Sequence, residues 1–238
     1  MLLRLDGVTK RFGEFTVIDD LTFNVEENDV FGIAGPNGAG KTTLFNVITG
    51  KYHAEGEINF MGSKIHGLPP HQICHKGIAR TFQMPLLFNS MDILSNIRVG
   101  AHFGNIQSQE EEKIIKDILL FTELKGKENL PVSSLKIYDK KLTMLAAALA
   151  TQPKLLLLDE PVGGLSPIEA DEFIKQVKKI NEEMGITVIV IEHMMRVLVE
   201  ISNSLMILDN GKKISFGKPE EVVKNPKVIE VYLGDDGA

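Results

Sequence analysis

A run of glycines followed by lysine and threonine has the residue types and spacing needed to bind the phosphates of a nucleotide. The pattern G-x-x-x-x-G-K-[ST] is met at every fixed position by Gly35, Pro36, Asn37, Gly38, Ala39, Gly40, Lys41 and Thr42. Glycine permits backbone conformations in which several N–H groups point inward at one phosphate. We expect Lys41 to reach the β- and γ-phosphates of ATP, and the Thr42 hydroxyl to ligate Mg²⁺, with Thr43 beside them.

The segments around this loop are those that a phosphate site requires. Residues 30–34 are apolar and predict a buried strand, and residues 42–49 predict a helix closed by Gly50. A helix beginning beside Lys41 adds the favourable field of its N-terminus to the bound anion. The alternative is an ordinary glycine turn, which the strand and helix on either side disfavour.

Two adjacent carboxylates follow a second apolar run. Residues 155–158 are four leucines, and Asp159 and Glu160 come directly after them. We expect Asp159 to hold Mg²⁺ and Glu160 to orient or deprotonate an attacking water molecule. The alternative is an acidic strand end that is merely solvated, because carboxylates are mostly exposed.

A third apolar run, residues 186–191, ends in Glu192 and His193. Between the second and third runs, Ser166 and Glu169 have the spacing of a capping box, with Pro167 at the first helical position. Strand, helix and strand in this order predict a parallel crossover. Residues 205–208 and 214–216 flank Asn210-Gly211, which favours a two-residue hairpin turn.

The remaining segments predict two smaller lobes. Residues 2–8, 17–20 and 21–25 are short and β-prone, which predicts an antiparallel β lobe at the front. Residues 92–151 predict a helical sub-lobe, with helices at 110–121 and 142–150. We therefore expect one unit over residues 1–238, an α/β P-loop NTPase with a RecA-like core and these two lobes.

Composition narrows the classes of partner. The chain has 238 residues, 43% of them hydrophobic, a single cysteine and a formal net charge of −6. No stretch approaches the roughly 20 apolar residues needed to cross a bilayer, so we expect no direct membrane insertion. The acidic balance disfavours nucleic acid as a partner. Lone Cys74 and the charged start suit a cytoplasmic protein that reaches the membrane through a protein partner.

The ordered set of motifs resembles the nucleotide-binding domains of ABC transporters over nearly the whole chain. The resemblance implies that Phe12 stacks on adenine, that Gln83 senses Mg²⁺ and water and touches the membrane subunit, and that His193 contacts the γ-phosphate. It also places Gly164-Leu165-Ser166-Pro167 at the interface of a dimer. Taken alone, Phe12 would be core packing, Gln83 a surface amide and His193 a strand-end histidine.

Within that family the details resemble the ATP-binding subunits of branched-chain amino acid importers. The likeness is carried by Arg80-Thr81-Phe82-Gln83, Ile191-Glu192-His193-Met194 and Asn225-Pro226-Lys227-Val228-Ile229-Glu230-Val231-Tyr232-Leu233-Gly234. It implies an ATP-hydrolysing subunit working with transmembrane permease subunits. Urea, amide and lipopolysaccharide transporters have related subunits, so the cargo and the direction of transport stay open.

One segment departs from the family pattern. Leu135-Lys136-Ile137-Tyr138-Asp139 stands where the family has an LSGGQ-like signature, whose serine and glycines clamp the partner subunit's γ-phosphate. Ile137 and Tyr138 add side chains where backbone should approach closely. Our hypothesis is a head-to-tail dimer with a different ATP-binding subunit that has an intact signature, although a homodimer is possible. The alternative is a simple helix start capped by Ser133 or Ser134.

Two other functional classes remain at this stage. A non-catalytic ATP-binding module would explain the altered segment, but Glu160 and His193 argue for turnover. A DNA-repair or translation ATPase of the same superfamily would require coiled coils or basic extensions, and the chain has neither.

Overall fold

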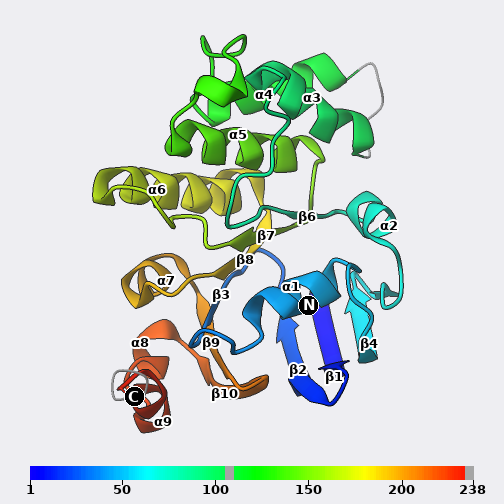
Figure 1. Ribbon diagram of the computed structural model, residues 1–238, viewed down its shortest axis with the longest axis vertical. Helices are drawn as coiled ribbons and strands as arrows, with labels where there is room; N and C mark the ends of the chain where they lie inside the picture. The colour runs from blue at the N-terminus through cyan, green and yellow to red at the C-terminus, as the bar shows by residue number, and fades with distance from the viewer. Residues whose placement is uncertain (105–109, 234–238) are drawn as a thin grey trace.

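The computed structural model describes residues 1–104 and 110–233. Residues 105–109 of the expected helical sub-lobe, and Gly234 to the end of the chain, lie outside the described residues. Two sheets and a group of helices form three regions, with the helical lobe above the larger sheet and the antiparallel sheet below it (Figure 1). This arrangement confirms the α/β fold with an antiparallel β lobe and a helical lobe.

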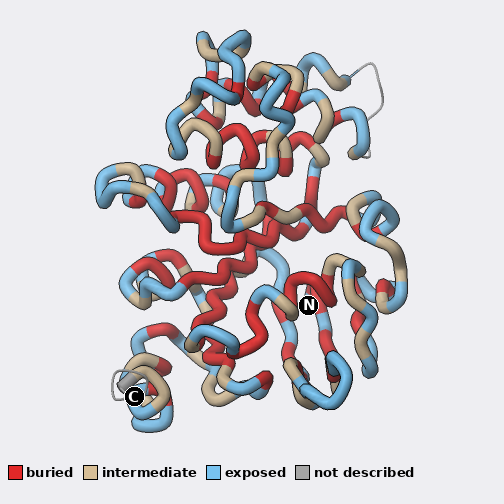
Figure 2. Tube along the Cα trace, in the orientation of Figure 1, coloured by how far each residue is buried: buried red, intermediate tan, exposed pale blue. Residues whose placement is uncertain are grey.

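The larger sheet is 6-stranded and has the order β10-β9-β3-β8-β7-β6. Its strands are β3 (Val30–Ala34), β6 (Ile78–Arg80), β7 (Leu155–Asp159), β8 (Thr187–Ile191), β9 (Ser204–Asp209) and β10 (Lys212–Gly217). Every pairing is parallel except that of β9 with β10. Strands covered on both faces read as unbroken apolar runs, and β3, β7 and β8 are buried throughout (Figure 2).

The predicted hairpin is present between β9 and β10. The two residues between the strands are Asn210 and Gly211, with φ angles of 45° and 77°. Positive φ at both central positions is what a type I′ turn requires, and its twist matches that of the flanking strands.

The smaller sheet is 4-stranded and antiparallel, in the order β2-β1-β4-β5. Its strands are β1 (Leu3–Phe12), β2 (Phe15–Val25), β4 (Glu55–Phe60) and β5 (Ser63–Lys64). The prediction of three short strands was wrong in detail, because 17–20 and 21–25 belong to one strand. Asp20 has a φ of 50° inside β2, so the polar residues there mark a local irregularity of the strand and not a turn.

Helices cover the sheets and connect their strands. They are α1 (Lys41–Ile48), α2 (Pro70–His75), α6 (Pro167–Met184), α7 (Met195–Ile201), α8 (Pro219–Val222) and α9 (Pro226–Leu233). The capping box predicted for α6 is confirmed, since Ser166 accepts from the Glu169 N–H and the Glu169 carboxylate accepts from the Ser166 N–H. The crossover from β7 through α6 to β8 is parallel, as expected.

The helical lobe contains α3 (Ile93–Phe103), α4 (Glu111–Phe121), the 3-10 turn η1 (Val132–Ser134) and α5 (Ile137–Ala150). The helix expected at 110–121 is therefore found, while the one expected at 142–150 begins earlier, at Ile137. The segment does begin a helix, but its N-cap is Lys136, so the expected cap at Ser133 or Ser134 was wrong.

Two apolar cores lie on opposite faces of the larger sheet. One, between this sheet and the antiparallel sheet, includes Leu44, Phe45 and Ile48 of α1. The other joins the sheet to α6 and to the helical lobe through residues such as Phe173 and Leu145. In the part of the chain that the structure describes, no helix is long and apolar enough to cross a membrane.

Candidate functional site

The phosphate loop joins the end of β3 to the start of α1. Gly40 is the N-cap of α1, with a φ of 99°. A Cβ atom on Gly40 would lie 2.6 Å from the carbonyl oxygen of Val17, and one on Gly35 would lie 1.9 Å from that of Leu208. Only glycine fits at these positions, because the loop is seated directly against the backbones of β2 and β9.

Lys41 is drawn back across the loop. Its side chain is buried, and its ammonium donates to the carbonyl oxygens of Gly35 at 2.6 Å and Pro36 at 2.8 Å. Burial lowers the pKa of Lys41, while Glu160 and Asp159 act in the opposite direction. The Lys41 ammonium is thus bound by main-chain carbonyls, and phosphate oxygens can take the place of these carbonyls. Thr42 is exposed beside it on the first turn of α1.

Asp159, at the end of β7, is held on one side only. Its Oδ2 accepts from Arg80 at 2.7 Å, and Arg80 also donates to Asn46 of α1 at 2.7 Å. Its Oδ1 is buried and has no hydrogen-bond partner among the described residues. Burial raises the pKa of Asp159, and the Arg80 guanidinium lowers it. An unpartnered carboxylate oxygen is a ligand that Mg²⁺ and its water molecules favour, so the residues present fit that ion.

Two of the other predicted side chains contact the Glu160 carboxylate. Its Oε2 lies 2.8 Å from His193 Nε2 and 2.5 Å from Gln83 Nε2, so residues far apart in sequence meet at one oxygen. Glu160 has a φ of 48°, an uncommon conformation for a residue other than glycine. Such backbone strain concentrates at functional sites.

Glu192 supports this group from behind. It is 1% exposed, and its carboxylate accepts from the backbone N–H of Val162 at 3.0 Å and of His193 at 3.3 Å. Burial raises the pKa of Glu192. Glu192 therefore ties the segment after Glu160 to the segment that carries His193.

Phe12 lies at the end of β1, on the antiparallel sheet. The residue is 43% exposed, and its ring meets the ring of Tyr52 edge-to-face, with centroids 5.3 Å apart. The Lys10 ammonium lies 4.6 Å from the centre of the Phe12 ring. Tyr52 follows α1, and its N–H donates to Asn46 of that helix. The aromatic pair thus adjoins the helix that begins at Lys41, and an exposed ring face can stack on a planar base.

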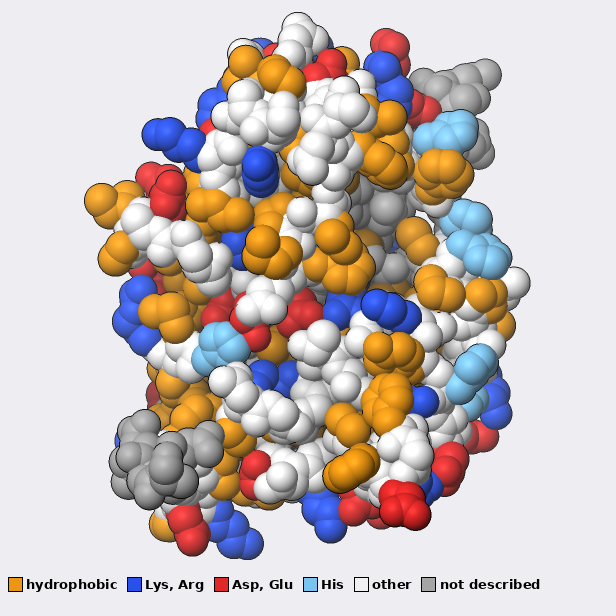
Figure 3. All heavy atoms as spheres, viewed as in Figure 1, with side chains coloured by type: hydrophobic (Ala, Val, Ile, Leu, Met, Phe, Trp, Pro, Cys, Tyr) orange, Lys and Arg blue, Asp and Glu red, His pale blue; other side chains and the backbone are white. Residues whose placement is uncertain are grey.

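The structure brings most of the predicted residues to the carboxyl ends of the parallel strands. Acidic and basic side chains meet near the middle of this face, between the helical lobe and the sheets (Figure 3). Sequence reasoning missed the pairing of Arg80 with Asp159, the ring of Tyr52 and the buried ammonium of Lys141. The last of these had a signal, because Lys141 follows Ile137 and precedes Leu145 and Ala148 on the apolar stripe of a helix.

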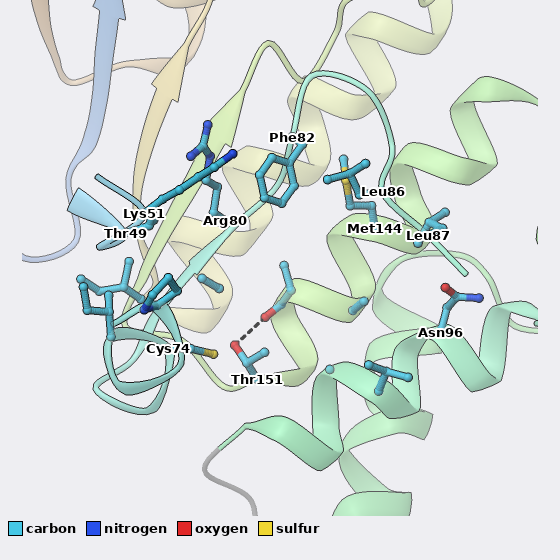
Figure 4. A pocket seen from close by; sticks show the side chains of 18 of the residues that line it. Thr49, Lys51, Cys74, Arg80, Phe82, Leu86, Leu87, Asn96, Met144 and Thr151 are labelled. Carbon is cyan, nitrogen blue, oxygen red and sulfur yellow. Dashed lines mark hydrogen bonds between the residues drawn. The ribbon is translucent and has the colours of Figure 1, made fainter. Parts of the chain in front are cut away.

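An apolar groove lies between the core and the helical lobe. Its volume is about 380 Å³, and its lining includes Phe82, Leu86 and Phe88 from the segment joining β6 to α3. Figure 4 shows Phe82, Leu86 and Leu87 around Met144 of α5. Leu86 is 64% exposed and Phe88 54%, which is unusual for large apolar side chains grouped together.

The segment that replaces the expected signature opens α5 with full-sized side chains. Lys136, its N-cap, makes no side-chain capping hydrogen bond, and Ile137 is 36% exposed. Tyr138 packs against the core that joins the larger sheet to α6 and the helical lobe, and burial raises the pKa of Tyr138 to about 12. Asp139 pairs with Lys127 at 2.7 Å. No glycine is available in this helix start for close approach of a phosphate to the backbone.

Comparison with protein families gives two matches. A family described as "ABC transporter" matches residues 18–163, and one described as "Branched-chain amino acid ATP-binding cassette transporter" matches residues 212–238. The first spans the phosphate loop and both strand-end carboxylates. The second spans β10 and the C-terminal helices.

Individual relatives agree with the family matches. The chain is 33% identical to the high-affinity branched-chain amino acid transport ATP-binding protein BraF of Pseudomonas aeruginosa, covering 98% of each chain. It is 34% identical to the probable LivG protein of Methanocaldococcus jannaschii, again covering 98% of each.

Solved structures are equally similar. A nucleotide-free ATP-binding cassette from an ABC transporter aligns with a TM-score of 0.89 at 32% identity, covering 97% of this chain and 98% of that chain. An ADP conformation of such a cassette also aligns with a TM-score of 0.89 at 32% identity, covering 98% of each.

Proposed function

Because this chain belongs to the ATP-binding subunits of ABC transporters, we propose that its phosphate loop and strand-end carboxylates hydrolyse ATP to energise the import of branched-chain amino acids. The cargo is taken from the relatives and from the match over residues 212–238. As one unit over residues 1–238, the subunit would work at the inner face of the cell membrane, attached through permease subunits.

The meeting of Gln83 and His193 on one oxygen of Glu160 carries this proposal. A carboxylate that is to orient or deprotonate a water molecule must be held in place, and hydrogen bonds from two sides do so. In this proposal His193 would meet the terminal phosphate, and Gln83 would meet the water. Glu160 and His193 are the catalytic residues of the proposal.

The nucleotide would be held by the phosphate loop, with Phe12 against the base. Backbone N–H groups of residues 35–43, Pro36 excepted, would surround the phosphates, and Lys41 would exchange its carbonyl partners for phosphate oxygens. Asp159, Thr42 and Gln83 are the proposed ligands of Mg²⁺, directly or through water. When bound, Mg²⁺ neutralises charge on the phosphates. The unpartnered Oδ1 of Asp159 supports its place in this set.

The groove beside Gln83 is the proposed contact with the permease. It lies between the core and the helical lobe, and the exposed apolar side chains of Leu86 and Phe88 line it. Proteins of this family energise membrane transporters, and a permease segment against Phe82 would be coupled to Glu160 through the adjacent Gln83. Movement of the lobes with the nucleotide state would then reach the permease.

The second ATP-binding subunit of the proposal is a different chain. Lys136, Ile137 and Tyr138 stand where a phosphate of the facing subunit would require small residues, so a homodimer would contain two obstructed sites. A partner with an intact signature leaves one competent site, formed on this chain's own phosphate loop. Mixing the purified chain with that partner should raise turnover well above that of either chain alone.

A second function is supported by the same segment, in which the subunit would bind ATP as an assembly or regulatory module with little turnover. Another cargo, such as urea, an amide or lipopolysaccharide, is a separate alternative on which this segment does not bear. The exchanged signature residues favour slow turnover, whereas the intact Glu160–His193 contact favours hydrolysis.

Replacing Glu160 tests the proposal directly. In the assembled transporter, Glu160→Gln should keep Mg-ATP binding and lower kcat by about 10²- to 10⁴-fold, the range expected for a lost general base. Lys41→Ala should remove nucleotide binding itself. Calorimetry with Mg-ATP and a phosphate-release assay measure the two quantities separately.

The two functions give opposite results for the Gln variant. If hydrolysis ends the ATP-bound state, Glu160→Gln should trap an ATP-bound dimer that persists during gel filtration. An unchanged dimer lifetime, together with unchanged turnover, would favour the assembly module. Wild-type affinity in Lys41→Ala would contradict both.

A further inference from the structure

Lys141 is a buried cation in the helix that joins the helical lobe to the core. It lies in α5 and is 2% exposed, which makes it one of the largest fully buried side chains of the protein. Burying an ammonium is costly unless donors and charges are satisfied, so its partners are informative.

Those partners are main-chain carbonyls of the candidate site. Lys141 Nζ donates to the carbonyl oxygen of Glu160 at 3.1 Å and to that of Gln83 at 3.3 Å. Glu160 and Gln83 are also the two residues whose side chains meet each other. The Lys141 ammonium therefore binds the backbones of both Glu160 and Gln83, whose side chains contact each other at the proposed reacting group.

The backbone conformation of Glu160 is unusual. Its φ of 48° is unfavourable for a residue with a Cβ atom. Its N–H donates to Ile191 at 2.9 Å, and its carbonyl accepts from Gly163 at 3.2 Å as well as from Lys141. In this conformation the Glu160 carboxylate contacts His193, and Lys141 is the one side chain that bonds the Glu160 carbonyl among the described residues.

The Lys141 ammonium is a charge taken out of water, with main-chain carbonyls as its hydrogen-bond acceptors. An apolar side chain of similar length would fill the same volume without desolvating a charge. A buried charge that contacts the unusual backbone of Glu160 is more readily explained by the site than by the core.

We infer that Lys141 is a positioning residue for ATP hydrolysis, fixing the Glu160 backbone so that its carboxylate points at the attacking water. The inference rests on the proposed function of Glu160. Because α5 opens at the dimer-facing segment 135–139 of the proposal, the same ammonium makes the carboxylate sensitive to the placement of that helix.

The test compares three variants in the assembled transporter. Lys141→Met keeps side-chain length and should lower kcat by about 10-fold or more while leaving the KM for ATP within about 2-fold, since misplacing a catalytic group affects the chemical step. Lys141→Arg retains a donor and should recover most of the turnover. Lys140→Met removes the neighbouring charge of the same helix and should leave kcat unchanged.

A purely structural lysine would behave differently. It would change the thermal midpoint but leave kcat at wild-type level in the folded variant, and that outcome would overturn the inference. Recovery in Lys141→Arg no better than in Lys141→Met would also overturn it. If Lys141→Met does not fold, Lys141→Gln, which cannot reach both carbonyls, replaces it with the same expected loss of kcat.

A double variant separates this inference from the proposed function. If Lys141 acts through Glu160, Lys141→Met should add no further loss of turnover to Glu160→Gln, because coupled residues are not additive. Additive losses would contradict the inference. Full activity in Glu160→Gln alone would overturn both ideas, whereas full activity in Lys141→Met alone would overturn only the role of Lys141.

Discussion

At the level of single residues, this site contains charged side chains that are buried and stabilised by an oppositely charged partner. Asp159 and Arg80 are almost fully buried, at 4% and 6% side-chain exposure, and they are joined at 2.7 Å. The Arg80 guanidinium also contacts the rings of Phe45 and Phe82, with centroid distances of 5.3 and 4.9 Å. The pair fixes the end of β7, and with it the carboxylate proposed for Mg²⁺.

Breaking this pair should be costly. Arg80→Met leaves the Asp159 carboxylate buried without its cation, so we expect a loss of about 3–5 kcal/mol in the free energy of unfolding. Arg4→Met breaks the Arg4–Asp6 pair, whose side chains are both 48% exposed, and should cost at most about 1 kcal/mol. Chemical denaturation of both variants checks the contrast, and equal losses would contradict it.

What sequence alone reveals at this scale depends on how local the chemistry is. The phosphate loop is contiguous, so its residues could be identified from their order along residues 35–42. The contact of Arg80 with Asp159, and that of Lys141 with two carbonyls, join segments far apart in the chain. Such contacts depend on strand order and helix packing, which a motif does not contain.

Among the elements, the helices α6, which packs on the larger sheet, and α5, in the helical lobe, differ at their N-termini. α6 begins with the reciprocal hydrogen bonds of Ser166 and Glu169, whereas α5 begins at Lys136 without a side-chain cap. The first N–H groups of a helix need acceptors, and lysine has none to offer. The departure from the family pattern therefore affects both the fold of α5 and its chemistry.

Introducing a cap should stabilise α5. Lys136→Ser places a hydroxyl at the N-cap and should raise the free energy of unfolding by about 1 kcal/mol. Ser166→Ala, the reverse change at α6, should lower it by a similar amount. Thermal or urea unfolding measures both, and a destabilised Lys136→Ser would mean that the lysine has a partner more valuable than a cap.

Element boundaries show where sequence patterns lose their meaning. The runs at 155–158 and 186–191 predicted β7 and β8 because strands buried on both faces are apolar throughout. β4, by contrast, buries only Ile58 and Phe60 and its first residues are exposed, so no strong pattern marked it as a strand. Its pairing with β1 creates the strand, and that pairing is a tertiary fact.

The C-terminal helix α9 contains a buried polar group whose effect on stability can be tested. The hydroxyl of Tyr232 in α9 is buried and has no hydrogen-bond partner of good geometry among the described residues. Burial raises the pKa of Tyr232 to about 12. Tyr232→Phe should therefore leave stability unchanged or raise it by up to about 1 kcal/mol, because no partner is left unpaired. A loss of more than about 1 kcal/mol in urea unfolding would reveal a hydrogen bond.

For the molecule as a whole, the two cores share one sheet, and the charged groups lie along its carboxyl edge. Asp159 and Glu192 end neighbouring segments there, and burial raises the pKa of each. The fold thus brings carboxylates together where the parallel strands end, which favours cation binding at the expense of stability. This trade predicts how the stability of the whole protein changes with pH.

Glu192 allows that trade to be measured. A raised pKa means that the folded state binds the proton more tightly than the unfolded state, so stability falls as pH rises from the ordinary value of 4.5 through the raised value. Glu192→Gln cannot lose a proton, so its stability relative to wild type should increase across this window and level off above it. Any hydrogen bond lost with the carboxylate shifts the difference by a constant and leaves its slope intact. Thermal midpoints of both proteins from about pH 4 to about pH 8 give the slope. Glu183→Gln removes an exposed carboxylate from α6, and an equally steep slope in that variant would show that the effect does not come from the buried position.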